Sequence, residues 1–174
     1  DKNSLSHLFY FDNFRFYKKD ITDEKVVKKI LKNQDIIIPL AALVGAPLCE
    51  KFKNKTIKTN VKSIEILLKN IKKKQRIIYP TTNSGYGIGE KNKFCDETSP
   101  LKPVSLYGTT KVKAEELIIK NGNSICFRLA TVFGYSYRMR TDLLVNNFVE
   151  RAVKTRKLEI FEPNFRRNYI HVKD

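Results

Sequence analysis

Residues 105–117 read SLYGTTKVKAEEL and carry the clearest helix signal in the chain. Small and polar residues open the segment, and apolar residues recur at helical spacing from Thr109 on. Tyr107 and Lys111 stand four residues apart, so a helix presents their side chains on one face. A free tyrosine has a pKa of about 10, and a nearby fixed cation lowers that pKa. The pair predicts a base for a sugar or alcohol hydroxyl, and it also fits an aromatic residue at a helix start with a solvated lysine.

The overall composition is that of a globular protein. A chain of 174 residues with 41% hydrophobic residues can bury a core and indicates one domain. No apolar run is long enough to span a bilayer, because the longest, at residues 35–47, contains two prolines and a glycine. We therefore expect no membrane-spanning segment and no membrane partner.

The cysteine and histidine pattern gives no sign of a metal site. Cys49, Cys95 and Cys126 are odd in number, far apart and free of any C-x-x-C motif. His7 and His171 are too distant in sequence to suggest a metal-binding pair. These features argue against a zinc site or a disulfide framework and favour a reducing compartment. We expect a cytoplasmic protein without a bound metal.

The net charge of +16 raises the alternative of a basic nucleic-acid-binding module. Much of the charge comes from lysines spread through predicted helices, and the densest run, at residues 72–74, falls where a helix should end. Cations at that end are favoured by the helix dipole. No recognised nucleic-acid motif accompanies the lysines, so we interpret them as a solvated surface and expect no nucleic-acid partner.

Hydrophobic periodicity predicts an alternation of strands and helices. Predicted helices cover residues 23–33, 56–73 and 141–156, besides the one that continues from Thr109. Predicted strands cover residues 14–18, 35–40, 76–79, 124–129, 158–161 and 168–172. This alternation is typical of an α/β fold whose parallel sheet has helices on both faces. Ligands of such sheets bind beyond the carboxyl ends of the strands, where this chain has Ala41-Ala42-Leu43, Thr81-Thr82-Asn83 and Ala130-Thr131-Val132.

A series of short motifs occurs in a characteristic order along the chain. They are Asp20-Ile21, Leu40-Ala41-Ala42, Asn60-Val61, Thr81-Thr82 with Tyr86-Gly87, Tyr107-x-x-x-Lys111, RLATVFG at residues 128–134 and RNYIHV at residues 167–172. Together they resemble the extended short-chain dehydrogenase/reductases, and among these the NAD-dependent nucleotide-sugar epimerase/dehydratase group. The resemblance covers nearly the whole chain and implies a Rossmann-like parallel sheet with flanking helices.

The resemblance implies a role for each motif. Tyr107 would be the general acid/base, Lys111 would hold the nicotinamide ribose and lower the pKa of Tyr107, and Thr82 would bond the reacting hydroxyl. The implied contacts to NAD, with NADP left open, are Asp20, Ile21, Leu40, Ala41, Ala42, Asn60, Thr81, Tyr107, Lys111, Ala130 and Val132. The implied contacts to a nucleotide-diphosphate sugar are Thr82, Thr131, Asn146, Asn147 and Arg167. Structural alternatives stay open, such as a strand-end cap at Thr82, a helix-backbone contact at Asn60, a turn at Asp20 and a surface cation at Arg167.

The implied reaction is epimerisation, through transient oxidation of a sugar hydroxyl and reduction on the other face. Dehydratases of the group usually carry an acidic pair just after the catalytic threonine, where this chain has Asn83 and Ser84. The missing acid favours an epimerase, and a nucleotide-sugar dehydratase or reductase of the same family is the alternative. A non-catalytic NAD-binding scaffold remains an alternative from another class, because fold does not fix function.

The chain departs from the group at its start. The group begins with a Gly-rich turn, G-x-x-G-x-x-G, that binds the pyrophosphate, and no such run occurs here. We therefore expect a fragment that lacks the first βαβ segment of a longer, homodimeric enzyme. Residues 1–140 would be a partial NAD-binding Rossmann domain and residues 141–174 the start of a substrate-binding region. Alone, the fragment is expected to bind NAD weakly or not at all, and tight stoichiometric binding in calorimetry would contradict this.

Overall fold

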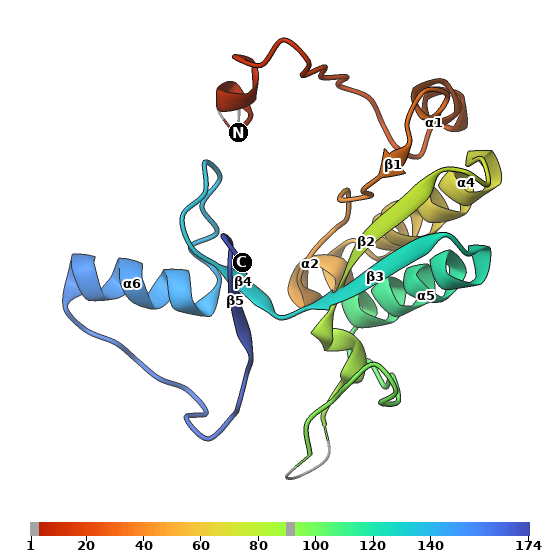
Figure 1. Ribbon diagram of the computed structural model, residues 1–174. Coiled ribbons are helices and arrows are strands. Elements are labelled where there is room, and N and C mark those ends of the chain that lie inside the picture. The colour runs from red at the N-terminus through yellow and green to blue at the C-terminus, as the bar shows by residue number, and fades with distance from the viewer. Residues whose placement is uncertain (1–3, 90–92) are drawn as a thin grey trace. The chain divides into compact units, whose positions relative to one another are not determined.

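The protein was analysed as a computed structural model, which describes residues 4–89 and 93–174 (Figure 1). The chain divides into two compact units. One unit is residues 18–129, and the other combines residues 1–17 with residues 130–174. Each unit has its own parallel strands.

The unit of residues 18–129 contains a three-stranded parallel sheet in the order β1-β2-β3. Its strands are β1 (Ile36–Ile37), β2 (Arg76–Thr82) and β3 (Ser124–Leu129). The register pairs Thr82 with Leu129, so the carboxyl ends of β2 and β3 meet at one edge of the sheet. The predicted α/β class with a parallel sheet and flanking helices is confirmed.

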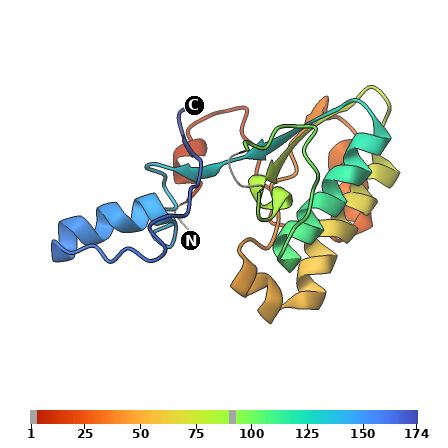
Figure 2. The same ribbon diagram turned by 90° about the horizontal axis from the view of Figure 1, so that it is seen from below.

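Three helices lie on one face of this sheet: α1 (Glu24–Leu31), α4 (Ser63–Asn70) and α5 (Leu106–Asn121) (Figures 1 and 2). The Asp23 carboxylate caps α1 by accepting the backbone N–H of Lys25 at 2.9 Å. The Ser105 hydroxyl caps α5 by accepting the N–H of Gly108 at 3.1 Å. Because of this second cap, α5 begins before Thr109, and Tyr107 lies in its first turn.

Side-chain alternation along the strands decides which residues the helices cover. Ile77 and Tyr79 point under the helices and are almost fully buried. They pack in one cluster with Val27, Leu31, Ile64, Leu67, Ala114 and Ile118. Residues that alternate with them, such as Ile125 and Phe127, are exposed on the opposite face. The prediction of helices on both faces of this sheet is therefore wrong for the described part of residues 18–129.

The segment before β2 is more broken than its periodicity predicts. The expected continuous helix over residues 56–73 is replaced by α3 (Lys53–Ile57), a π-helical turn η2 (Lys58–Lys62) and α4. A further helix, α2 (Ala46–Lys51), follows the loop after β1, since Gly45 and Pro47 start a helix there. π-Helical turns are frequent at functional sites, and this one turns Asn60 inward, where it is almost fully buried.

The second unit pairs β4 (Thr131–Phe133) with β5 (Tyr169–His171) in parallel register. It also contains the short helix η1 (Ser6–Leu8) and the helix α6 (Leu144–Thr155), which confirms the helix expected over residues 141–156 within a few residues. The predictions of strands at residues 14–18 and 158–161 are wrong, because neither segment pairs with a strand among residues 4–89 and 93–174. Across both units, no described helix has the length and apolar character to cross a membrane.

Candidate active site

Helix α5 places Tyr107, Lys111 and Glu115 at intervals of one turn. Lys111 is only 5% exposed, because it faces β2 rather than solvent. Its Nζ donates a hydrogen bond of 2.8 Å to the carbonyl of Pro80 and lies 3.9 Å from the ring centroid of Tyr79. The ammonium is therefore held under the end of β2 by a carbonyl and an aromatic face.

Burial lowers the pKa of Lys111 to about 8, and the neighbouring Cys126 and Glu115 oppose this shift. Lys111 is consequently an ammonium at neutral pH but loses its charge well before an ordinary lysine would. Any electrostatic support that Lys111 gives to a nearby phenolate should decline above about pH 8.

A pH dependence of stability follows from this pKa. Between about pH 8 and the ordinary pKa of 10.5, the unfolded chain binds a proton at Lys111 that the folded chain does not. The free energy of unfolding should therefore rise with pH in this window, relative to Lys111→Met, by on the order of 2 kcal/mol. Urea unfolding of both proteins at several pH values measures the difference, with Lys113→Met on the exposed side of α5 controlling for lost charge. If the unfolding free energy of the unsubstituted protein, relative to that of Lys111→Met, fell with pH in this window, the burial of the Lys111 charge would be contradicted.

The Tyr79 ring lies beside this ammonium, whereas Tyr107 lies one turn earlier on α5, and the environments of the two tyrosines differ. Tyr79 is 2% exposed, and burial raises the pKa of its phenol, with a smaller contribution from the nearby Tyr107 phenol. Tyr107 is half-buried and thus reaches the surface of the unit. A sealed phenol with a raised pKa is a poor base, so Tyr107 is the better candidate for proton transfer. The sequence analysis did not include Tyr79, since a tyrosine in an apolar strand looks like an ordinary core residue.

Thr82 ends β2 close to the start of α5. Its hydroxyl accepts the N–H of Ser84 at 3.2 Å and caps the short helix η3 (Asn83–Tyr86). A Cβ at Gly108 would lie 3.1 Å from the carbonyl oxygen of Ser84, so η3 and the first turn of α5 are in close contact. The structure thus brings the Thr82 segment beside the Tyr107 turn. Because a hydroxyl both accepts and donates, the bond to Ser84 leaves the Thr82 proton available.

Thr81 carries a hydroxyl with an unusual environment. The residue is 5% exposed, and its Oγ1 has no hydrogen-bond partner among the described residues. Buried hydroxyls are normally paired. An unpaired one at the carboxyl end of β2 fits a polar group of a bound ligand.

Asn60 joins three segments of the unit through its amide. It exchanges hydrogen bonds with both backbone groups of Leu43, at 2.8 and 3.0 Å, and donates to the Thr110 hydroxyl at 3.2 Å. Thr110 in turn donates to the backbone carbonyl of Tyr107 at 3.0 Å. Asn60 therefore ties the loop after β1 to the helix that carries Tyr107.

Replacing Asn60 with leucine should cost about 2–3 kcal/mol of unfolding free energy, because it leaves the Leu43 N–H buried without its partner. Asn54→Leu, on exposed α3, is the matched control and should cost less than about 0.5 kcal/mol. Denaturant unfolding measures both values. Equal costs would show that the amide bridge does not stabilise the unit.

The remaining cofactor positions of this unit lie at its surface. The Asp20 carboxylate accepts the N–H and hydroxyl of Thr22, both at 2.8 Å, and these bonds lower the pKa of Asp20. Ile21 follows in the same turn and is half-buried. Leu40 and Ala41 are exposed after β1, and Ala42 is half-buried. Nothing in these positions tests their assigned contact with a cofactor, which stays a prediction.

The predicted residues of the other unit are described within that unit. Asn146 is 8% exposed, accepts the N–H of Gly134 and donates to the carbonyl of Arg140, both at 3.1 Å. Asn147 donates to the carbonyl of Thr141 at 3.0 Å. Both amides thus shape the loop between β4 and α6. The other predicted positions are Ala130 and Thr131, which are half-buried, and Val132 and Arg167, which are exposed.

Known proteins resemble this chain along its whole length. A profile of the NAD dependent epimerase/dehydratase family matches residues 2–174. The dTDP-D-glucose 4,6-dehydratase of Dictyostelium discoideum is 26% identical over 192 aligned positions, which cover 99% of this chain and 44% of that protein. The UDP-glucose 4-epimerase of Lactobacillus helveticus is 31% identical over 108 positions, covering 60% of this chain and 32% of that protein.

A solved structure agrees in fold. The UDP-glucuronic acid 4-epimerase from Bacillus cereus, in complex with UDP-glucuronic acid and NAD, matches with a TM-score of 0.83 and 25% identity. The match covers 97% of this chain and 55% of that chain. The match therefore spans between about a third and a little over half of the length of each of these relatives.

Proposed function

The chain belongs to the NAD dependent epimerase/dehydratase family, and from this we propose that its protein is an NAD-dependent nucleotide-sugar epimerase. The observation that carries the proposal is the arrangement around α5. A half-buried Tyr107 lies in the first turn, a buried Lys111 ammonium follows one turn later, and Thr82 ends the adjacent strand. A proton acceptor, a cation and a hydroxyl are the groups that oxidation of a sugar alcohol requires.

The residues near the end of β2 fit the nicotinamide end of the cofactor. The unpaired Thr81 hydroxyl supplies a polar contact, and Tyr107 and Lys111 would face the nicotinamide ribose. When bound, NAD accepts a hydride from the sugar carbon and returns it. The other proposed cofactor contacts are Asp20, Ile21, Leu40, Ala41, Ala42, Asn60, Ala130 and Val132. NADP is a possible replacement under the same proposal.

The protein's own groups handle the proton. The Thr82 hydroxyl donates a hydrogen bond to the sugar oxygen and so orients the sugar hydroxyl toward Tyr107. The Tyr107 phenolate takes the hydroxyl proton as the alcohol becomes a ketone and gives it back when the ketone is reduced. The positive charge of Lys111 stabilises the Tyr107 phenolate. The proposed sugar-nucleotide contacts beyond Thr82 are Thr131, Asn146, Asn147 and Arg167.

The residues after Thr82 favour an epimerase over a dehydratase. Asn83 and Ser84 form the start of η3, and neither can supply a proton for the elimination of water. Similarity alone does not separate the two reactions, because the relatives include both a dehydratase and epimerases. A dehydratase or reductase of the same family is therefore the second candidate.

Further properties belong to the same proposal. We place a partial NAD-binding domain at residues 1–140 and the start of a substrate region at residues 141–174. We also propose a homodimer in the cytoplasm. A basic nucleic-acid-binding module and a non-catalytic NAD-binding scaffold are the alternatives from other classes, and only the net charge of +16 favours the first of them.

The test is an assay of the complete protein with NAD and either UDP-glucose or dTDP-glucose, followed by proton NMR of the sugar. An epimerase should convert the configuration at one sugar carbon without loss of water. A keto-deoxy product would instead support the dehydratase. No change in any sugar, together with salt-sensitive retention on DNA, would overturn the proposal in favour of the nucleic-acid module.

A further inference from the structure

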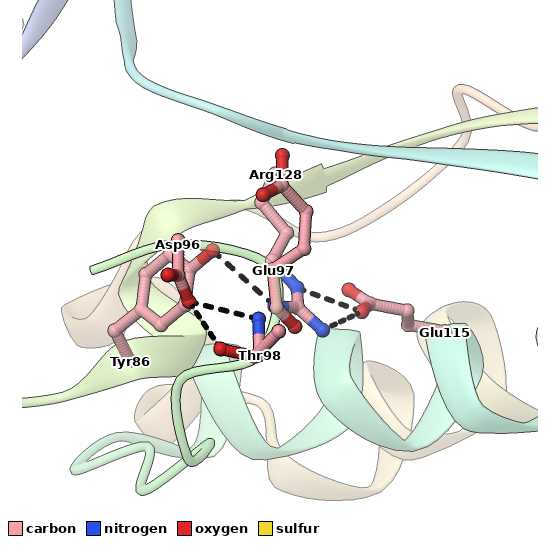
Figure 3. A network of polar contacts seen from close by, with 6 residues as sticks. All are labelled: Tyr86, Asp96, Glu97, Thr98, Glu115 and Arg128. Atoms are coloured by element: carbon pink, nitrogen blue, oxygen red, sulfur yellow. Dashed lines mark hydrogen bonds and ion pairs between the residues drawn. The ribbon is translucent and has the colours of Figure 1, made fainter.

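The guanidinium of Arg128, on β3, joins three segments of residues 18–129 (Figure 3). Its Nε and a terminal nitrogen donate to one carboxylate oxygen of Glu115 on α5, at 2.8 and 2.7 Å. The other terminal nitrogen donates to the Tyr86 phenol at 3.2 Å and to the Glu97 carbonyl at 3.1 Å. Figure 3 shows Arg128 between Glu115 on one side and the Tyr86 and Glu97 segments on the other.

This ion pair differs from the surface pairs of the chain in its burial. The side chain of Glu115 is 3% exposed and that of Arg128 is 17% exposed. Taking such charges out of water is costly unless their hydrogen bonds are satisfied, and removing one partner leaves the other buried and unpaired. The register of β3 explains the location, because Arg128 pairs with Thr81 and so shares the face of the sheet that α5 covers.

The Tyr86 contact acts on the segment that follows Thr82. Tyr86 ends η3, which begins directly after Thr82. A Cβ at Gly85 would lie 3.0 Å from the side chain of Val112 on α5, so η3 packs directly against that helix. The guanidinium, 5.2 Å from the Tyr86 ring centroid, holds the far end of η3 in this position.

The Glu97 contact acts on the loop that leads into α5. This carbonyl belongs to a turn in which the Asp96 carboxylate accepts the N–H and the hydroxyl of Thr98 at 2.9 and 2.7 Å (Figure 3). The same carboxylate accepts the Ser99 hydroxyl at 3.0 Å. The turn is held by its own side chains, so one bond from Arg128 is enough to anchor it. Two parts of the connection between β2 and α5, η3 and the turn at residues 96–99, therefore meet at one guanidinium.

We propose that Arg128 is a positioning residue. Held by Glu115, its guanidinium fixes η3 and the turn at residues 96–99 against α5, and this sets the approach of Thr82 to Tyr107. The structural part of the proposal is independent of the reaction, whereas its catalytic consequence rests on the proposed function. Only an arginine can make these contacts together, because its fork of N–H groups points in several fixed directions.

Amide hydrogen exchange on Arg128→Lys and Arg128→Met tests the structural part. The amides of Ser84 and Gly87 should exchange roughly tenfold faster in Arg128→Met, while those of Ile77 and Tyr79 in the core keep their protection. Arg128→Lys should restore protection only in part, since a point charge can pair with Glu115 but cannot also reach Tyr86 and Glu97. Arg151→Met removes a more exposed arginine–glutamate pair in the other unit and is the matched control.

Kinetics of the complete protein test the catalytic part. We expect Arg128→Lys to lower kcat by roughly tenfold with KM for the nucleotide sugar and the pH profile unchanged, because the charges around Tyr107 remain. A role limited to stability would lower the melting temperature and leave kcat intact below it. Such an intact kcat, or exchange that rises equally at Ser84 and in the core, would overturn the proposal.

A milder variant keeps the proposal testable if Arg128→Met does not fold. Tyr86→Phe keeps the ring and removes only the phenol bond, and it should still speed exchange at Gly87. Unchanged exchange at Gly87 in every folded variant would overturn the proposal. If the unsubstituted protein converts no nucleotide sugar, the proposed function fails, and the exchange data still decide whether Arg128 positions η3.

Discussion

Replacing Tyr107 with phenylalanine is expected to lower turnover of the complete protein by about 10²- to 10⁴-fold, the range of a lost general acid/base. Phenylalanine keeps the ring in the first turn of α5 and removes only the group that exchanges a proton with the sugar hydroxyl. The fold should persist, because Tyr107 is half-buried and its backbone carbonyl still accepts the Thr110 hydroxyl. Turnover is measured from product formation under saturating nucleotide sugar.

Tyr79→Phe is the matched control for this variant. The Tyr79 ring centroid lies 3.9 Å from the Lys111 ammonium, and phenylalanine would keep the ring there. Since burial already holds this phenol protonated, its loss should reduce turnover far less than the loss of the Tyr107 phenol. A larger fall in Tyr79→Phe than in Tyr107→Phe would reverse the assignment of the two tyrosines. Undiminished turnover in Tyr107→Phe would remove the acid/base role altogether.

Gly87→Ala is expected to destabilise the unit by about 3 kcal/mol or more, near the upper end of single-residue effects. Gly87 has a φ of 69°, in the left-handed region that favours glycine. A Cβ there would also lie 1.9 Å from the carbonyl oxygen of Lys102, which is too close for any contact. Because the Lys102 oxygen belongs to the backbone and a Cβ is fixed rigidly to the backbone of residue 87, the two chain segments would have to move apart. The measurement is denaturant unfolding.

Gly122→Ala separates the two causes of the lost stability, which are the strained backbone at positive φ and the close approach to Lys102. Gly122 has a φ of 79°, and a Cβ there would meet nothing within 4 Å. Its substitution should therefore cost only the strain of this glycine-favouring backbone conformation, about 1–3 kcal/mol, and less than Gly87→Ala. If the two variants lose equal stability, the close approach of Gly87 and Lys102 contributes nothing, and the contact between the two ends of this loop is unimportant for the fold.

Local sequence patterns predicted the elements that depend on near neighbours. The helix that continues from Thr109 and the spacing of Tyr107 and Lys111 on it follow from contacts within a few residues. Hydrophobic periodicity gave wrong predictions where an element needs a second segment to pair with. The segments at residues 14–18 and 158–161 have the composition of strands, yet within the described part of the chain neither pairs with another strand. A strand depends on a partner chain segment that its own sequence does not specify.

In the candidate site, too, local sequence predicted some features and only the packing of distant segments decided others. Residue order along the chain was enough to predict the parallel α/β fold and the family, which the profile match over residues 2–174 confirms. Packing alone put Tyr79 under Lys111, joined Asn60 to Leu43, and placed Arg128 against Glu115. These contacts join residues 13 to 32 positions apart, and they depend on strand register and on which face of β2 the helices cover. Short-range spacing carries no information on either, so only the folded chain could reveal them.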